Sequence, residues 1–207
     1  PALPREELPE FYRRLILATN IERQNKIAIM LIMLVFVRNN ELRGGQWQEV
    51  DFKNKRWIIP AERMKHEKMK PKPALCVPLS DWAIELLQEL HTLTGHSRFM
   101  FPSRTNVNRH ISENTLGKII NEKLGYKGRA TPHGFRAVAS SLLYENNFNG
   151  GAIETQLAHV EENKIKDSYA YQADYMPQRI EFMQWYSDYL RERYNQALQM
   201  IQKDKAN

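Results

Sequence analysis

The longest apolar run of the chain covers residues 27–37, eleven consecutive side chains without a charge or a polar group. A helix that crosses a bilayer needs about 20 such residues, so this run is too short to span a membrane. A helix that is apolar on all sides is stable in water only inside a protein. The run therefore predicts a buried core helix, and we expect no membrane partner.

The other segments predict a mainly helical chain with a small sheet. Residues 8–17 and the segment up to residue 37 have helical patterns. After Gly44 and Gly45, three β-rich segments bounded by turn residues predict a short meander; they are residues 47–52, 56–59 and 75–77. Residues 62–72 carry five basic and two acidic side chains and are expected to form a hairpin loop. The fold class is therefore α+β, with a small three-stranded antiparallel sheet.

The second half predicts further helices. Ser80 is expected to cap a helix that Gly95 ends, and Ser112 to begin a helix that Gly125 stops. A shorter helix leads to His159. In the long last helix, apolar residues recur at intervals of three and four; they are Ile180, Met183, Tyr186, Leu190, Tyr194, Ala197 and Ile201. This stripe predicts packing, either on the chain's own core or on a neighbouring subunit.

The net charge and the cysteine content suggest a partner and a compartment. A net charge of +6 and a pI near 9.4 favour a polyanionic partner, most simply nucleic acid. The single cysteine, Cys76, excludes an internal disulfide framework and fits a reducing cytosol.

Residues 131–136 combine a helix start with a histidine and an arginine. Thr131 is a good N-cap, and Pro132 suits the first helical position. His133 and Arg136 are three residues apart, so they share a face at an end that favours anions. This arrangement indicates chemistry on a phosphate. The alternative is an ordinary helix start with a solvated arginine.

Several kinds of reaction centre are excluded by missing patterns. The chain has no His/Cys pairs at zinc spacing, and its carboxylates are scattered rather than clustered. It also lacks a glycine-rich phosphate loop and a nucleophile elbow. We therefore expect chemistry without a metal or a cofactor.

Arg38 and Glu41 are a further candidate pair, expected at the end of the buried helix. They could form a surface pair worth under about 1 kcal/mol. Alternatively, Glu41 could orient Arg38 toward a bidentate anion. His159 and, ten residues later, Tyr169 complete the set.

The order of these residues resembles the tyrosine recombinases, also called phage integrases, in the branch found in satellite prophages and genomic islands. The motifs are Arg-x-x-Glu-Leu at 38–42, a hairpin lysine, His-x-x-Arg at 133–136, Leu-Ala-His at 157–159 and a tyrosine ten residues further on. Four longer phrases, at 59–65, 77–80, 112–116 and 183–190, are also similar to that branch. The resemblance extends over almost the whole chain.

The resemblance implies a role for each candidate. Arg38 and Arg136 would clamp the scissile phosphate, with Glu41 in support, and His159 would hydrogen-bond it. His133 would be the acid or base nearest the nucleophile, Lys65 would protonate the leaving 5′ oxygen, and Tyr169 would be the nucleophile. The product would be a 3′-phosphotyrosyl bond.

Two of these assignments have rivals. Lys68, Lys70 and Lys72 lie in the same loop as Lys65, which follows Glu62-Arg63-Met64 as in similar sequences. Tyr171 and Tyr175 compete with Tyr169, whose interval from His159 matches this branch. The family usually has a residue such as Asn after the tyrosine, whereas Ala170 follows here.

The resemblance also implies the domain organisation and the partners. Residues 1–207 would be one catalytic domain, the C-terminal part of a longer integrase whose DNA-binding domains precede it. Residues 177–207 would form a C-terminal helix used for subunit contacts. The expected partners are double-stranded DNA attachment sites, three further copies in a tetramer, and accessory DNA-bending or excision factors in the bacterial cytoplasm, near the nucleoid. The alternative functions are a type IB topoisomerase-like enzyme and a catalytically inactive DNA-binding module.

Overall fold

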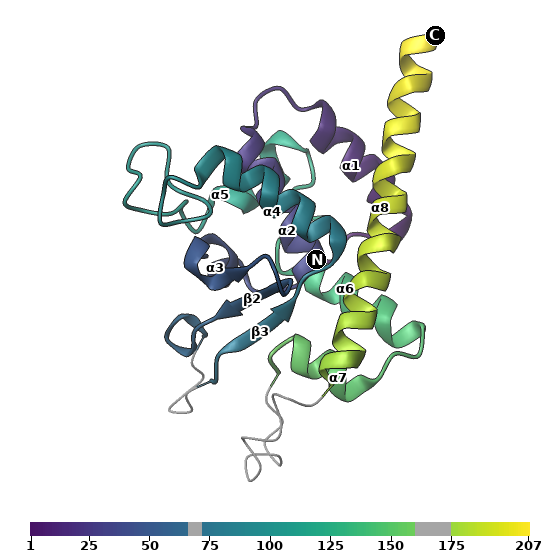
Figure 1. The fold of residues 1–207 in the computed structure, drawn as a ribbon. Helices are drawn as coiled ribbons and strands as arrows, with labels where there is room; N and C mark the ends of the chain where they lie inside the picture. Colours follow the sequence, from purple (N-terminus) through teal and green to yellow (C-terminus); the bar gives the residue numbers. More distant parts are fainter. Residues whose placement is uncertain (66–71, 160–174) are drawn as a thin grey trace.

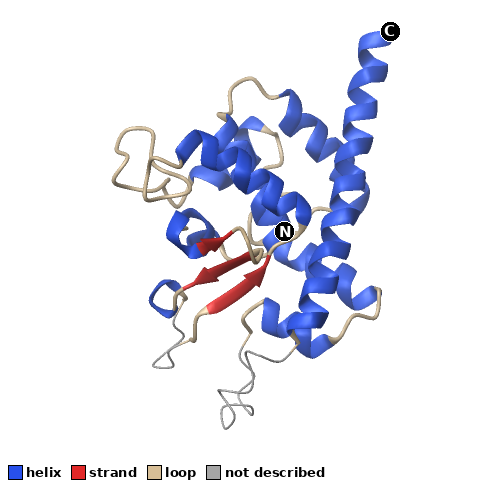
Figure 2. Cartoon of the chain, in the orientation of Figure 1, coloured by secondary structure: helices blue, strands red, loops and turns tan. Residues whose placement is uncertain are grey.

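The computed structural model describes residues 1–65, 72–159 and 175–207, and it consists of helices arranged around α2 with a small sheet at one side (Figures 1 and 2). The α-helices of these residues are α1 (Leu8–Leu17), α2 (Arg23–Val35), α3 (Asn39–Arg43), α4 (Asp81–Thr94), α5 (Thr115–Lys118), α6 (Gly134–Glu145), α7 (Gly150–Gln156) and α8 (Met176–Ala206). Short 3₁₀ turns are η1 (Arg5–Glu7), η2 (Trp47–Glu49) and η3 (Ala61–Arg63), and η4 (Ile119–Lys123) is a π-helical turn.

Helix α2 is the centre of the core. Every residue of the apolar run is buried, with at most 2% of its surface exposed, because α2 is in contact with α3, α4, α5, α6 and α8. The prediction of a buried core helix is confirmed. The helix ends at Val35, two residues before the run does, because Phe36 takes a left-handed conformation with φ 42°.

The sheet is an antiparallel meander in the order β1 (Val50–Asp51), β2 (Arg56–Ile59) and β3 (Leu75–Pro78). Trp57 pairs with both outer strands, and its side chain is 2% exposed. The predicted α+β class and the meander are confirmed. The first strand is shorter than predicted, because residues 47–49 form the turn η2.

Helix α8 packs along the body of the molecule, where it contacts α1, α2, α4, α6, α7 and β3 (Figure 1). Most of the predicted stripe is buried; these residues are Met183, Tyr186, Leu190, Ala197 and Ile201. Ile180 is 42% exposed, so it does not pack on the chain's own core. The stripe therefore packs on the chain's own core, which was the first of the two alternatives.

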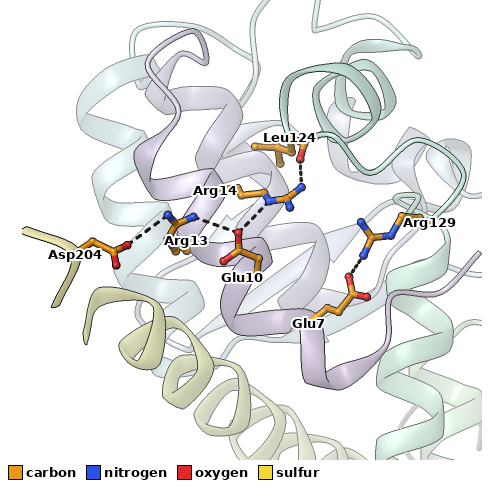
Figure 3. A network of polar contacts seen from close by, with 7 residues as sticks. All are labelled: Glu7, Glu10, Arg13, Arg14, Leu124, Arg129 and Asp204. Carbon is orange, nitrogen blue, oxygen red and sulfur yellow. Dashed lines mark hydrogen bonds and ion pairs between the residues drawn. The ribbon is translucent and has the colours of Figure 1, made fainter. Parts of the chain in front are cut away.

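Ion pairs and hydrogen bonds connect α1 to neighbours on two sides. Arg13 contacts Asp204 near the end of α8 at 3.4 Å, and Arg14 donates to the carbonyl oxygen of Leu124 at 3.0 Å. Figure 3 shows this network, which consists of Glu7, Glu10, Arg13, Arg14, Leu124, Arg129 and Asp204. Its ion pairs are largely exposed, and such pairs contribute about 0–1 kcal/mol each. They link α1 to the end of α8 and to the residue after η4.

The boundaries of the helix predicted from Ser112 differ from the prediction. The helix begins at Thr115, while the Ser112 hydroxyl contacts that of Thr115 at 2.9 Å. It ends before Gly125, whose φ of +77° favours glycine. Of the helices in the described ranges, none combines the length and the hydropathy that crossing a membrane requires.

Candidate active site

Arg136 lies in the first turn of α6 and is 5% exposed. Its Nη1 donates to the carbonyl oxygen of Phe36 and its Nη2 to that of Leu157 at 2.7 Å. A guanidinium has five N–H donors, so two donors bind the protein and three remain for another acceptor. Burial, with repulsion from Arg38, lowers the pKa of Arg136 to about 10. The side chain thus stays cationic at neutral pH, and the alternative of a solvated arginine is wrong.

The two carbonyl groups that accept from Arg136 lie at left-handed turns. Phe36 has a φ of 42°, and Ala158, the residue after Leu157, has a φ of 54°. Such conformations cost non-glycine residues about 1–3 kcal/mol each, and they gather at functional sites. The turns end α2 and α7, so they direct the chain toward Arg38 on one side and toward His159 on the other.

Arg38 does not close the buried helix as predicted. It is the N-cap of the next helix, α3, because the turn at Phe36 separates α2 from α3. The Glu41 carboxylate accepts from the Arg38 backbone N–H at 2.9 Å and from its Nη1 at 3.4 Å. The Glu41 side chain is 2% exposed and that of Arg38 is 17% exposed. A surface pair was therefore wrong, and the geometry is the one in which Glu41 orients Arg38.

Thr131 is not the N-cap of α6, because the helix begins later than predicted. Its hydroxyl oxygen accepts from the backbone N–H of Gly134 at 2.9 Å. Helix α6 starts at Gly134 rather than at Pro132, so His133 lies at the N-cap position. His133 and Arg136 therefore do not lie on one face of the helix as predicted. His133 is exposed just before the helix, and Arg136 lies in its first turn.

Four candidate side chains influence one another electrostatically. Partial burial lowers the pKa of His133, and the charges of Arg136, Arg38 and His159 lower it further. Charges have such an effect only at short range in a solvated protein. Arg136 also binds the carbonyl oxygens of Phe36 and Leu157, which lie two residues before Arg38 and His159. The fold therefore brings together the starts of α3 and α6 and the end of α7.

His159 follows α7 rather than ending it, since the helix stops at Gln156. Its Nδ1 contacts the Glu154 carboxylate at 2.7 Å, and the other oxygen of that carboxylate accepts from the Tyr144 hydroxyl at 2.7 Å. A carboxylate only accepts hydrogen bonds, so Nδ1 carries the proton in this contact. This fixes the ring orientation and leaves Nε2 as the nitrogen directed away from Glu154.

The lysine rivals differ in their surroundings. Lys65 is exposed and follows η3. Lys72 is 5% exposed, and its Nζ donates to the carbonyl oxygen of Ala158 at 3.2 Å. Lys68 and Lys70 lie outside the described residues. Lys72 thus connects the segment before β3 to the turn at Ala158, next to His159.

Tyr169 and its rival Tyr171 also lie outside the described residues, so the nucleophile stays a prediction. Tyr175, the third tyrosine considered, is the N-cap of α8. Its hydroxyl lies so near Gly151 that a Cβ there would approach it to 2.7 Å. This contact gives Tyr175 a packing role.

Arg179 is a buried cation that the sequence reasoning missed. It is 2% exposed; its Nε donates to the Gln156 side chain at 2.9 Å and its Nη2 to the carbonyl oxygen of Cys76. It therefore joins α8, α7 and β3. Its position three residues before buried Phe182 could have placed it on the apolar face of α8.

Across the described parts of the chain, no group of His, Cys, Asp and Glu side chains has the form of a metal site.

Curated relatives match most of this chain. A model described as the phage integrase family matches residues 3–176. The integrase of Enterobacteria phage P4 is 36% identical over 217 residues, covering 99% of this chain and 49% of the relative. The prophage integrase IntZ of Escherichia coli (strain K12) is 37% identical over 187 residues, covering 90% of this chain and 44% of the relative. The chain thus spans about half the length of the curated relatives it matches.

Solved structures share the fold. The integrase from mycobacterium phage Brujita has a TM-score of 0.63 at 15% identity, over 89% of this chain and 58% of that chain. The XerH site-specific recombinase, bound to a palindromic difH substrate in a post-cleavage complex, has a TM-score of 0.60 at 19% identity, over 77% of this chain and 46% of that chain. The fold is that of the tyrosine recombinases, and by its sequence this chain belongs to the phage integrase family.

Proposed function

We propose that this chain is the catalytic domain of a tyrosine-type site-specific DNA recombinase that integrates and excises a prophage or a genomic island. The supporting observation is that Arg136 binds the carbonyl oxygens of Phe36 and Leu157. These residues lie two positions before Arg38 and His159, so both are held near the helix start that carries His133 and Arg136. Two guanidinium groups and two imidazoles suit a phosphodiester that gains negative charge as it reacts.

The arginines stabilise the transition state in this proposal. Arg38 and Arg136 bind the non-bridging oxygens of the phosphate, and each charge-assisted hydrogen bond contributes about 1.5–3 kcal/mol. Because Glu41 and the carbonyl oxygens of Phe36 and Leu157 already hold the two guanidinium groups, little reorganisation is needed when DNA binds. His159, whose Nδ1–H binds the Glu154 carboxylate, donates a further hydrogen bond to the phosphate from Nε2 when the ring carries both protons.

The covalent step exchanges one phosphate ester for another. Tyr169 attacks phosphorus through its phenolic oxygen, a bond from phosphorus to that oxygen forms, and the bond to the 5′ oxygen breaks. A free tyrosine has a pKa of about 10, so a base must take its proton, and His133 has this role. Lys65 gives a proton to the leaving 5′ oxygen. The 3′-phosphotyrosyl bond conserves the energy of the broken ester, so a 5′-hydroxyl from another strand reverses the step without ATP.

The partners follow from the same proposal. The recombinase binds double-stranded attachment sites, where four copies assemble and residues 177–207 contribute to the subunit contacts. Accessory DNA-bending or excision factors join them in the bacterial cytoplasm, at the nucleoid. The support is that relatives are phage and prophage integrases and that XerH is a DNA-bound recombinase. These relatives favour strand exchange over the topoisomerase-like and inactive alternatives.

The test is to trap the covalent intermediate. The longer protein that contains this chain is incubated with nicked duplexes that tile the junction between the mobile element and the chromosome. The nick lets the cleaved fragment diffuse away, so a denaturing gel shows the adduct. We expect an adduct that Tyr169→Phe removes and Tyr171→Phe retains. An adduct that persists in Tyr169→Phe would assign the nucleophile to Tyr171. DNA binding without any adduct would contradict the proposal.

A further inference from the structure

A largely buried ion pair between Arg63 and Glu49 lies close to Lys65 in the chain. The reaction proposed above does not use it. Arg63, the last residue of η3, donates from Nε to one oxygen of Glu49 at 2.7 Å and from Nη2 to the other at 2.7 Å. The two side chains are 18% and 5% exposed. This bidentate geometry is the most directional that an arginine and a carboxylate can adopt.

Glu49 is itself fixed by two other donors. One of its oxygens accepts from the backbone N–H of Gln46 at 2.9 Å and from the indole N–H of Trp57 at 3.3 Å. Trp57 is buried in the middle strand. The carboxylate, at the end of η2, is therefore tied to the middle strand through Trp57, and it holds the guanidinium of Arg63 in one orientation.

The remaining nitrogen of the Arg63 guanidinium, Nη1, binds the residue that holds Arg38. Nη1 of Arg63 donates to the carbonyl oxygen of Glu41 at 3.1 Å, while the carboxylate of Glu41 holds Arg38. The approach to α3 is so close that a Cβ on Gly44 would lie 2.8 Å from Nη1. Glu41 thus holds Arg38 with its carboxylate and Arg63 with its backbone carbonyl oxygen.

Lys65 follows Arg63 by two residues. Met64, between them, is 3% exposed, and its backbone N–H donates to the carbonyl oxygen of Ala61 at 3.1 Å. The chain extends by at most about 3.6 Å per residue, so the Cα of Lys65 lies within about 7 Å of that of Arg63. The exposed lysine therefore follows within two residues a side chain, Arg63, whose guanidinium is bound to Glu41 and Glu49.

A buried ion pair adds little net stability, because desolvation offsets the attraction, so stability alone does not explain this one. We propose that Arg63 is a positioning residue that sets the distance between Lys65 and the phosphate held by Arg38. The inference rests on the proposed function, in which Lys65 is the acid for the leaving oxygen. A misplacement of about 1 Å can cost about 100-fold in rate, so we expect Arg63→Ala to slow cleavage by that factor.

The experiment separates a misplaced acid from a damaged fold. The longer protein is given two duplexes, one with the normal phosphodiester and one with sulfur in place of the bridging 5′ oxygen. A thiol has a pKa of about 8.5, far below that of an alcohol, so the thiolate leaves without a proton from the enzyme. Arg63→Ala should cleave the normal duplex about 100-fold more slowly and the sulfur duplex at nearly the wild-type rate. Lys65→Ala should show the same rescue.

Arg23 and Glu89 provide a matched control, because they form the same bidentate pair, at 2.6 and 2.8 Å, in an exposed place. Arg23→Ala should behave like the wild type on both duplexes. If Arg63→Ala does not fold, Arg63→Lys and Glu49→Gln, which remove the fork with a smaller change, are compared on the same two substrates.

Three results would overturn the inference: an equal loss on both duplexes in Arg63→Ala, no loss on either, or a Lys65→Ala variant that the sulfur substrate does not rescue. Failure of the proposed function is distinct, because then the wild type forms no adduct with either duplex.

Discussion

The Nη2 atom of Arg136 lies 2.7 Å from the carbonyl oxygen of Leu157. This hydrogen bond ties the first turn of α6 to the turn after α7, and Nη1 of the same side chain ties it to the end of α2 at Phe36. A single buried guanidinium therefore fixes how three helix ends meet.

Arg136→Lys should damage both the chemistry and the fold. An ammonium keeps the charge but cannot reach both carbonyl oxygens and a phosphate at once. We expect cleavage to fall by about 100-fold or more and the free energy of unfolding by about 1–3 kcal/mol. Adduct formation and urea unfolding measure the two effects. Unchanged stability would contradict the structural part, and Arg23→Lys is the control.

Glu41 should matter as an acceptor more than as a charge. Glu41→Ala leaves the Arg38 backbone N–H without its side-chain partner, at a cost of about 1–3 kcal/mol. Glu41→Gln keeps an oxygen in that place and should cost less. Both variants should cleave more slowly, because Arg38 loses its orientation. If thermal unfolding found alanine as stable as glutamine, the capping role would be wrong.

Lys65 and Lys72 should give opposite phenotypes. Lys65 is exposed, so Lys65→Ala should leave stability unchanged and slow the leaving step. Lys72 is buried and donates to Ala158, so Lys72→Ala should lower the free energy of unfolding by about 1.5–3 kcal/mol. Lys72→Ala should also cleave DNA more slowly, and this slower cleavage should persist with the sulfur substrate. Rescue of Lys72→Ala by that substrate would instead make Lys72 the acid.

The stability of the chain should depend on pH through His133. Burial and the nearby cations lower its pKa in the folded state, so the unfolded state binds more protons at mildly acidic pH. Stability is therefore full above the unfolded pKa of about 6.5 and falls as the pH drops through that value. Replacing the ring by His133→Gln should reduce this loss between pH 7 and pH 5, as measured by thermal melts.

Salt provides the internal control for that pH effect. The positive charges of Arg136 and Arg38 contribute to the shift, and about 1 M salt screens exposed charges beyond about 3 Å. The difference in pH slope between the wild type and His133→Gln should therefore be smaller at high salt. Equal slopes for the two proteins at low salt would show that His133 is not responsible.

The proposed subunit contacts of residues 177–207 need surface variants. Removing α8 would destroy the core, since Phe182, Tyr186 and Leu190 are buried. Ile180 and Leu198 are 42% and 38% exposed on the same helix. Their double change to serine should leave the fold intact and weaken assembly on DNA, as measured by analytical ultracentrifugation. Leu93→Ser, at a 43% exposed position of α4, is the control, and unchanged assembly would count against this role.

Local patterns predicted most elements but not every boundary. The apolar run, the Ser80 cap and the β-meander follow from spacing and capping chemistry, and they were confirmed. The assignment of Arg38 to the end of the long helix was wrong, because Phe36 takes a left-handed conformation that glycine would normally mark. A tertiary contact with Arg136 holds that carbonyl, and nothing in the nearby residues signals it.

The sequence by itself determined most helices and strands, because these depend on neighbours a few positions apart. It also determined the family and the candidate residues, through the order of short motifs along the chain. Only the tertiary structure decided which groups meet. Arg136 binds carbonyl groups 100 and 21 residues away, and Arg63 binds Glu49 and Glu41. The physical reason is that a buried cation must have acceptors at hydrogen-bond distance, and the packing of distant helices determines which acceptors those are.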